Sequence, residues 1–267
     1  MLRQIGLNAP EVLAQDLERG FLLLTDLGNQ TYLQALDQDN ANELFSDAID
    51  ALIRWQLASR PGTLPPYDEF LLGRELNLFP DWYVARHLKR ELTSVQRATL
   101  DEQFGRIMGA NLAQPCVYVH RDYMPRNLMV STPNPGILDF QDAVYGPISY
   151  DLVSLFKDAF ISWEEERVLD WTIRYWERAR KAGLPVADDF GEFYRAFEWM
   201  GLQRHLKVLG IFARINYRDG KPGYLQDTPR FVNYVRKACE RYAELTPLLR
   251  LFDELMGAEA ATAGYTF

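Results

Sequence analysis

The sequence has few residues that bind metals through nitrogen or sulfur, or that cross-link a chain. Among 267 residues it has two cysteines, Cys116 and Cys239, and three widely spaced histidines, His87, His120 and His205. This spacing argues against a disulfide framework and against a histidine-based zinc site. The sequence also lacks a signal-peptide pattern and any apolar run near the roughly 18 residues of a membrane-spanning helix. We therefore expect a reduced, cytoplasmic protein that has no membrane partner.

Basic residues are outnumbered by acidic ones, 29 to 37. The formal net charge is −8 and the isoelectric point is near 5.0. Binding to a phosphate backbone needs a basic face, so this balance argues against nucleic acid as a partner, although not against a nucleotide accompanied by Mg²⁺. A hydrophobic content of 48% with 13% aromatic residues is typical of a globular chain.

The most informative stretch spans residues 117–142. Three short apolar runs surround a polar loop and a turn: 117–119, 128–130 and 137–138. The turn, TPNPG at 132–136, predicts a hairpin between the second and third runs. This arrangement gathers Asp122, Asn127 and Asp139 at the ends of short strands, where we expect them to face one cleft.

Phosphoryl transfer is the chemistry that needs such a trio. Its loose, highly charged transition state requires positioning and charge neutralisation. We expect Asp122 to accept the proton of the attacking hydroxyl. Asn127 and Asp139 supply the oxygen ligands that Mg²⁺ prefers. Asparagine follows Asp122 by five residues and Asp139 follows Asn127 by twelve, which fits that division of roles.

This spacing resembles the catalytic loop and metal-binding aspartate of the protein-kinase-like fold. Asp139-Phe140 is not followed by glycine, and only eleven residues separate Asp139 from Asp151, so no long activation loop fits. The run GPISYDLV, which contains Asp151, resembles the aminoglycoside phosphotransferase family. Four longer segments are similar to bacterial anomeric sugar kinases that phosphorylate N-acetylmuramate and N-acetylglucosamine at C1 in cell-wall recycling: HRDYMPRNLMV, LDFQDAVYGP, YDLVSLFKDAF and EWMGLQRHLKVLGIFARI.

The resemblance implies an α+β fold with an incomplete small β lobe and a mainly helical large lobe. Residues 1–28 would be the remainder of the small lobe, with strands at 11–16 and 20–25. Residues 29–267 would form the helical lobe, with the catalytic loop and the acceptor-sugar site. The hinge between the lobes would hold the adenine edge of ATP through the backbone of Thr25, Asp26 and Leu27.

Apolar periodicity predicts the helices of the larger lobe. They are expected at 40–58, 68–78, 81–88, 94–113, 150–161, 163–182, 188–215 and 228–245. Pro80 is expected to separate the second from the third, with Asp81 as an N-cap. The stretch 195–214 is apolar nearly all round, so it should be the buried spine of the lobe, and Gly201 and Gly210 should allow close helix packing.

Several further residues are assigned roles near the loop. We expect His120 to be structural and Asp151 to organise the catalytic loop. Arg121 is expected to pair with a buried carboxylate, for which Asp151 is one candidate. Asp142 fits contact with the metal or the sugar, or helix capping.

The acceptor residues are predicted from charge. N-acetylmuramate carries a lactyl carboxylate, so its site benefits from a guanidinium or an imidazolium. Arg204 and His205 are the candidates, with Glu198 and Tyr145 for sugar hydroxyls. The alternative is that the basic residues of this segment form a solvated helix face.

The sequence contains no counterpart of the phosphate-anchoring half of a nucleotide site. Its first lysine is Lys89, and only Gly6 precedes Gly20, so neither a strand lysine nor a glycine-rich loop is present before the predicted hinge. We expect the first three small-lobe strands to be missing, this chain alone to bind ATP weakly, and strands 11–16 and 20–25 to have an unpaired edge. An aminoglycoside or other small-molecule kinase, and a truncated non-catalytic sugar-binding module, stay open as alternatives. No oligomeric state is predicted.

Overall fold

The computed structural model describes residues 1–257. By internal contacts they form two compact units, here called unit 1 (1–66 and 115–194) and unit 2 (67–114 and from Arg195 onward). The mapping of residues 1–28 and 29–267 onto two lobes stays a prediction. Across the described residues, every helix is too short or too polar to cross a lipid bilayer.

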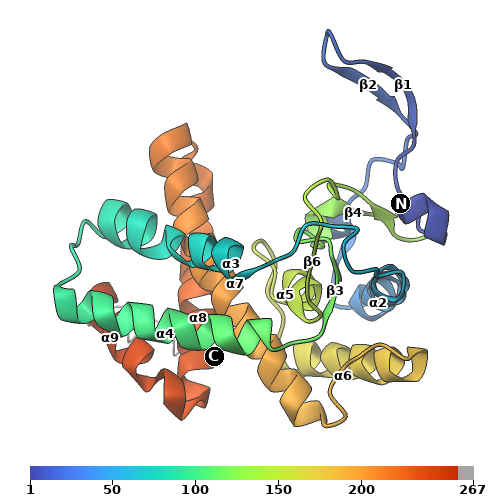
Figure 1. Cartoon of the computed structure of the whole chain (residues 1–267). Coiled ribbons are helices and arrows are strands. Elements are labelled where there is room, and N and C mark those ends of the chain that lie inside the picture. The colour runs from blue at the N-terminus through green and yellow to red at the C-terminus, as the bar shows by residue number, and fades with distance from the viewer. Residues whose placement is uncertain (258–267) are drawn as a thin grey trace. The chain divides into compact units, whose positions relative to one another are not determined.

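Unit 1 contains three two-stranded antiparallel sheets (Figure 1). They are β1 (Val12–Asp16) with β2 (Phe21–Leu24), β3 (Cys116–Val119) with β6 (Val144–Pro147), and β4 (Leu128–Met129) with β5 (Gly136–Ile137). The strands predicted at 11–16 and 20–25 and the hairpin across residues 132–136 are thus confirmed. Strand β6 was not predicted, because its Gly146-Pro147 ending resembles a loop.

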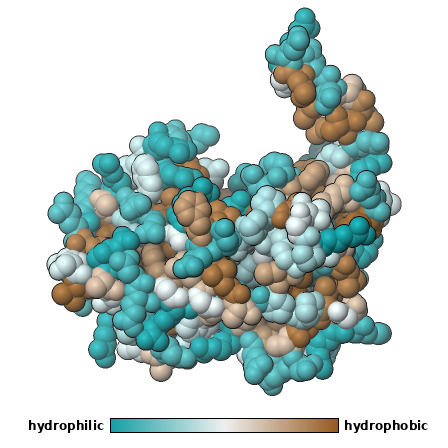
Figure 2. Space-filling view, viewed as in Figure 1, coloured by the Kyte–Doolittle hydropathy of each residue, from teal (hydrophilic) through white to brown (hydrophobic). Residues whose placement is uncertain are grey.

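The hairpin of β1 and β2 carries apolar side chains that are exposed to solvent (Figure 2). Leu17, at its turn, is 73% exposed and Phe21 is 68% exposed. Within the part of the chain that the structure describes, each of these strands pairs only with the other. The expected unpaired edge is therefore present.

The helices of unit 1 surround an aromatic core. They are η1 (Leu2–Ile5), α1 (Tyr32–Ala35), α2 (Ala41–Leu57), η3 (Pro125–Asn127), α5 (Tyr150–Phe156) and α6 (Glu165–Ala182). Phe45 of α2 packs against Phe156 of α5 and Trp171 of α6, with ring centroids 5.5 and 4.6 Å apart. The helices predicted at 40–58 and 163–182 are confirmed, whereas the one predicted at 150–161 already ends at Phe156.

Unit 2 is helical. Its elements are α3 (Glu69–Leu76), η2 (Phe79–His87), α4 (Ser94–Leu112), most of α7 (Phe190–Asp219), η4 (Pro222–Asp227), α8 (Thr228–Arg241), η5 (Ala243–Leu245) and α9 (Thr246–Met256). Two expectations were wrong here. Asp81 is not an N-cap, because η2 is a π-helix that already begins at Phe79 and holds Pro80 in its first turn, where a missing N–H costs nothing. The helix predicted at 228–245 ends at Arg241, and Pro247 opens α9 instead.

The middle of α7 is the buried spine that the sequence predicted. Residues 201–210 are all buried. A Cβ added at Gly210 would lie 2.3 Å from the backbone carbon of Leu78, so this glycine does permit close packing. Glu75 and Lys207 form a buried ion pair with an O–N distance of 2.9 Å.

Candidate active site

The polar loop after β3 is fixed by a buried carboxylate. Asp151, in the first turn of α5, is fully buried and accepts hydrogen bonds from the backbone N–H of His120 (2.7 Å) and of Arg121 (3.0 Å). Arg121 has a φ of 74°, a left-handed conformation that is rare for a residue with a side chain. The two bonds from one charged group therefore hold a strained turn in the position that presents Asp122.

His120 joins this loop to the strand that leads to Asp139. Its Nε2 lies 3.0 Å from the carbonyl oxygen of Leu138, to which it donates. Burial lowers the pKa of His120 to about 4, although the negative charges of Asp122 and Asp139 act in the opposite direction. The imidazole is therefore neutral at neutral pH and serves as a hydrogen-bond donor rather than as a base.

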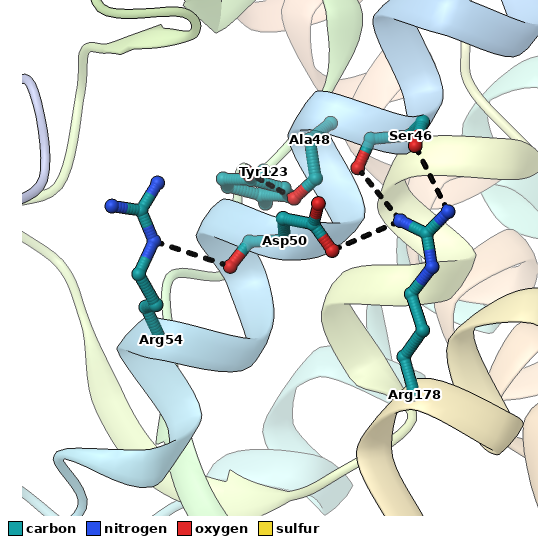
Figure 3. A network of polar contacts seen from close by, with 6 residues as sticks. All are labelled: Ser46, Ala48, Asp50, Arg54, Tyr123 and Arg178. Atoms are coloured by element: carbon teal, nitrogen blue, oxygen red, sulfur yellow. Dashed lines mark hydrogen bonds and ion pairs between the residues drawn. The ribbon is translucent and has the colours of Figure 1, made fainter. Parts of the chain in front are cut away.

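Tyr123 attaches the same loop to helix α2 (Figure 3). Its hydroxyl donates to the carbonyl oxygen of Ala48 at 2.8 Å, and burial raises its pKa well above the usual value, so it stays a donor. Two residues further along α2, Asp50 forms an ion pair with Arg178 of α6 at 2.9 Å. Tyr123 was not predicted as a site residue, although a large aromatic residue within a polar loop was a signal for an anchor.

Asn127 lies between the loop and Asp139. Its Nδ2 donates to the backbone oxygen of Asp122 at 3.0 Å and lies 3.4 Å from Oδ2 of Asp139. Asp139 is exposed, has a φ of 63°, and accepts a bond from Nε2 of Gln141 at 2.7 Å. The structure thus brings together the two residues that were predicted as metal ligands.

Asn127 and Asp139 carry oxygen atoms of the kind that Mg²⁺ prefers as ligands. No cluster of three or more His, Cys, Asp or Glu side chains with metal-binding geometry occurs among residues 1–257. Magnesium is instead held by one or two protein oxygens together with phosphates and water. Asn127 and Asp139 each carry a side-chain oxygen of this kind, and the amide nitrogen of Asn127 is the atom that faces Asp139 here, so their role as ligands stays a prediction.

The carboxylate of Asp122 is half-buried and accepts no hydrogen bond from any described residue. Its position beside Asn127 leaves it able to meet a hydroxyl group of a bound molecule.

The predicted adenine-binding segment packs near the β4–β5 hairpin. Thr25 accepts from the backbone N–H of Glu11 at 2.9 Å, and Asp26 accepts from that of Gly28 at 2.8 Å. A Cβ added at Gly136 would lie 3.0 Å from Cδ1 of Leu27. The segment and the hairpin that leads to Asp139 are therefore neighbours within unit 1.

The predicted acceptor residues are divided between the two units. Asp142 is exposed and Tyr145 is half-buried on β6 in unit 1. Glu198, Arg204 and His205 are buried on α7 in unit 2. Both carboxylate oxygens of Glu198 are bonded within unit 2, one to Arg241 and the other to the hydroxyl of Tyr242 at 2.7 Å.

The ring of His205 packs against Tyr234, with centroids 4.7 Å apart. The sugar-binding roles of these residues stay predictions.

Comparison with known proteins identifies the family. The model of the phosphotransferase enzyme family matches residues 1–190. The chain is 56% identical over 264 residues to an N-acetylmuramate/N-acetylglucosamine kinase of Neisseria meningitidis serogroup B, which covers 97% of this chain and 79% of that protein. A kinase of the same name from Pseudomonas putida is 54% identical over 261 residues, covering 98% of this chain and 77% of its own.

Solved structures support the fold. A choline/ethanolamine kinase family protein from Mesorhizobium loti matches with a TM-score of 0.61 at 16% identity, covering 96% of this chain and 80% of that one. An aminoglycoside phosphotransferase bound to ADP matches with a TM-score of 0.55 at 14% identity, covering 92% and 77%. The expected α+β, kinase-like fold with a mainly helical larger part is thus confirmed. The chain belongs to the phosphotransferase enzyme family.

Proposed function

We propose that this protein is an ATP- and Mg²⁺-dependent kinase that phosphorylates the anomeric hydroxyl of N-acetylmuramate and N-acetylglucosamine in cell-wall recycling. The relatives above half identity bear the name of that kinase. The structural observation that best supports the proposal is the arrangement of three residues around the loop of Asp122. The amide of Asn127 lies between Asp139 and the loop of Asp122, whose own carboxylate accepts no bond from a described residue.

In this proposal Asp122 is the general base. It takes the proton of the anomeric hydroxyl as the bond between that oxygen and the γ-phosphorus forms. The bond between the γ-phosphorus and the β–γ bridging oxygen breaks at the same stage, and ADP leaves. The neutral His120 and the buried Asp151 hold the turn that presents Asp122.

Asn127 and Asp139 would hold Mg²⁺ through their side-chain oxygens. The metal, when bound, neutralises charge on the β- and γ-phosphates. Thr25, Asp26 and Leu27 would contact the adenine edge through their backbone. Within unit 1, the acceptor would meet Asp142 and Tyr145, the two predicted acceptor residues that belong to the same unit as Asp122.

The test measures ADP release by the full product of the gene with three acceptors: N-acetylmuramate, N-acetylglucosamine and gentamicin. We expect turnover with both sugars. Asp122→Asn should lower kcat by roughly 10²–10⁴-fold, the usual contribution of a positioned general base. Asp50→Asn is the matched control, since it makes the same chemical change at an exposed ion pair on α2. ADP release only with gentamicin, or an Asp122→Asn enzyme of normal rate, would overturn the proposal.

A further inference from the structure

Arg126 is a positively charged residue of the catalytic loop that lies next to a predicted metal ligand. Arg126 stands directly before Asn127 in η3, and its side chain is exposed. Its guanidinium carbon lies 4.9 Å from the centre of the Phe160 ring, in the segment between α5 and α6. Among the described residues it forms no hydrogen bond or ion pair. A cation–π contact orients the group but leaves its charge and its five donors available to a ligand.

The geometry of η3 separates Arg126 from the metal ligands. A 3-10 helix has three residues per turn, so successive side chains leave it about 120° apart. Asn127 directs its amide toward Asp139, and Arg126 instead extends toward Phe160. In the proposed function Asn127 and Asp139 would hold the metal ion that accompanies the phosphates of ATP. Arg126 therefore leaves the loop in a different direction from Asn127, so that its charge is available to the acceptor rather than to the metal.

The surrounding charges would repel an anionic acceptor. Asp122, Asp139 and Asp142 place three carboxylates in the loop and just after it. N-acetylmuramate carries a carboxylate on its lactyl ether, and N-acetylglucosamine lacks that group. A guanidinium matches a carboxylate with two parallel N–H bonds and can offset this repulsion.

We propose that Arg126 is a specificity-determining residue that binds the lactyl carboxylate of N-acetylmuramate. The inference rests on the proposed function and concerns one of its two acceptors. Phe160 is the positioning residue, because its ring orients the guanidinium of Arg126.

The test compares kcat/KM for both sugars in Arg126→Ala, Arg126→Lys and Phe160→Leu. We expect Arg126→Ala to lower kcat/KM for N-acetylmuramate by about tenfold or more, mainly through KM, because a charge-assisted pair is lost. The value for N-acetylglucosamine should change far less. Arg126→Lys should recover part of the loss, and Phe160→Leu should give a smaller loss of the same selectivity. Arg60→Ala, at an exposed residue in a loop of unit 1, controls for the removal of a positive charge.

The possible results distinguish a failure of the inference about Arg126 from a failure of the proposed kinase function. Equal losses of kcat/KM with both sugars would indicate that Arg126 contacts the transferred phosphoryl group. That result would overturn the inference but not the proposed function. No loss with either sugar would overturn the inference too. A loss of kcat/KM for N-acetylmuramate alone in Arg204→Lys, with no such loss in Arg126→Ala, would indicate that Arg204 of α7 binds the lactyl carboxylate and would overturn the inference. A wild-type enzyme that phosphorylates neither sugar would instead remove the proposed function itself.

Discussion

Replacing Asp151 by asparagine removes the charge that holds the catalytic turn while keeping the size of the side chain. The carboxylate accepts the N–H groups of His120 and Arg121 at 2.7 and 3.0 Å from a fully buried position. An asparagine can accept only one of these bonds, and its amide group would face the other N–H. Each hydrogen bond to a charged group contributes about 1.5–3 kcal/mol. We expect Asp151→Asn to lower the free energy of unfolding by about 2–4 kcal/mol.

The matched control is Asp50→Asn. The side chain of Asp50 is 59% exposed and pairs with Arg178 at the surface (Figure 3), where such pairs contribute about 0–1 kcal/mol. Urea denaturation followed by circular dichroism gives both values. Amide hydrogen exchange adds a local measurement, because protection of the His120 and Arg121 amides should fall in Asp151→Asn alone. Equal stability losses in the two variants, with both amides still protected, would refute this view of the loop.

Three further predictions concern packing and titration. Gly210→Ala should destabilise by about 1–3 kcal/mol, since its Cβ would lie 2.3 Å from Leu78, whereas Gly105→Ala, in open space on α4, should be neutral or stabilising by up to about 1 kcal/mol in urea melts. Iodoacetamide should modify Cys116 but spare native Cys239, because burial raises the pKa of the Cys239 thiol to about 12; two modified thiols by mass spectrometry would contradict this. Burial lowers the pKa of His120 to about 4 against roughly 6.5 when unfolded. His120 therefore binds a proton less readily in the folded state than in the unfolded state. As a result, the free energy of unfolding should fall as the pH is lowered from about 6.5 to about 4. His120→Gln should flatten that part of the unfolding profile, and an unchanged slope would exclude the assignment.

Local patterns predicted much of unit 1. The apolar runs around the loop of Asp122 and the turn chemistry at residues 132–136 were sufficient for β3 and the β4–β5 hairpin. Apolar periodicity likewise predicted α2 and the buried course of α7, where Gly210 lies against Leu78.

Pairings between distant residues could not be predicted in the same way. The sequence of β6 favours a loop, and it forms a strand only because β3 lies beside it. The contact between Arg126 and Phe160 spans a helix, and the bond from Tyr123 to Ala48 spans 75 residues. Such contacts depend on the assembled fold and have no periodic signal. Pro80 was misread for a related reason, since proline is tolerated in the first turn of a helix and so does not by itself mark a break.

The most direct test of the central claim is phosphorus NMR of the reaction product. The full gene product is incubated with Mg-ATP and N-acetylglucosamine that carries ¹³C at C1. Transfer to the anomeric oxygen predicts a new phosphomonoester signal that is split by coupling to the labelled carbon and is lost in Asp122→Asn. A phosphate signal without that splitting would place the phosphate on another hydroxyl. Binding of the sugar without any new phosphorus signal would contradict the kinase assignment and favour a sugar-binding module.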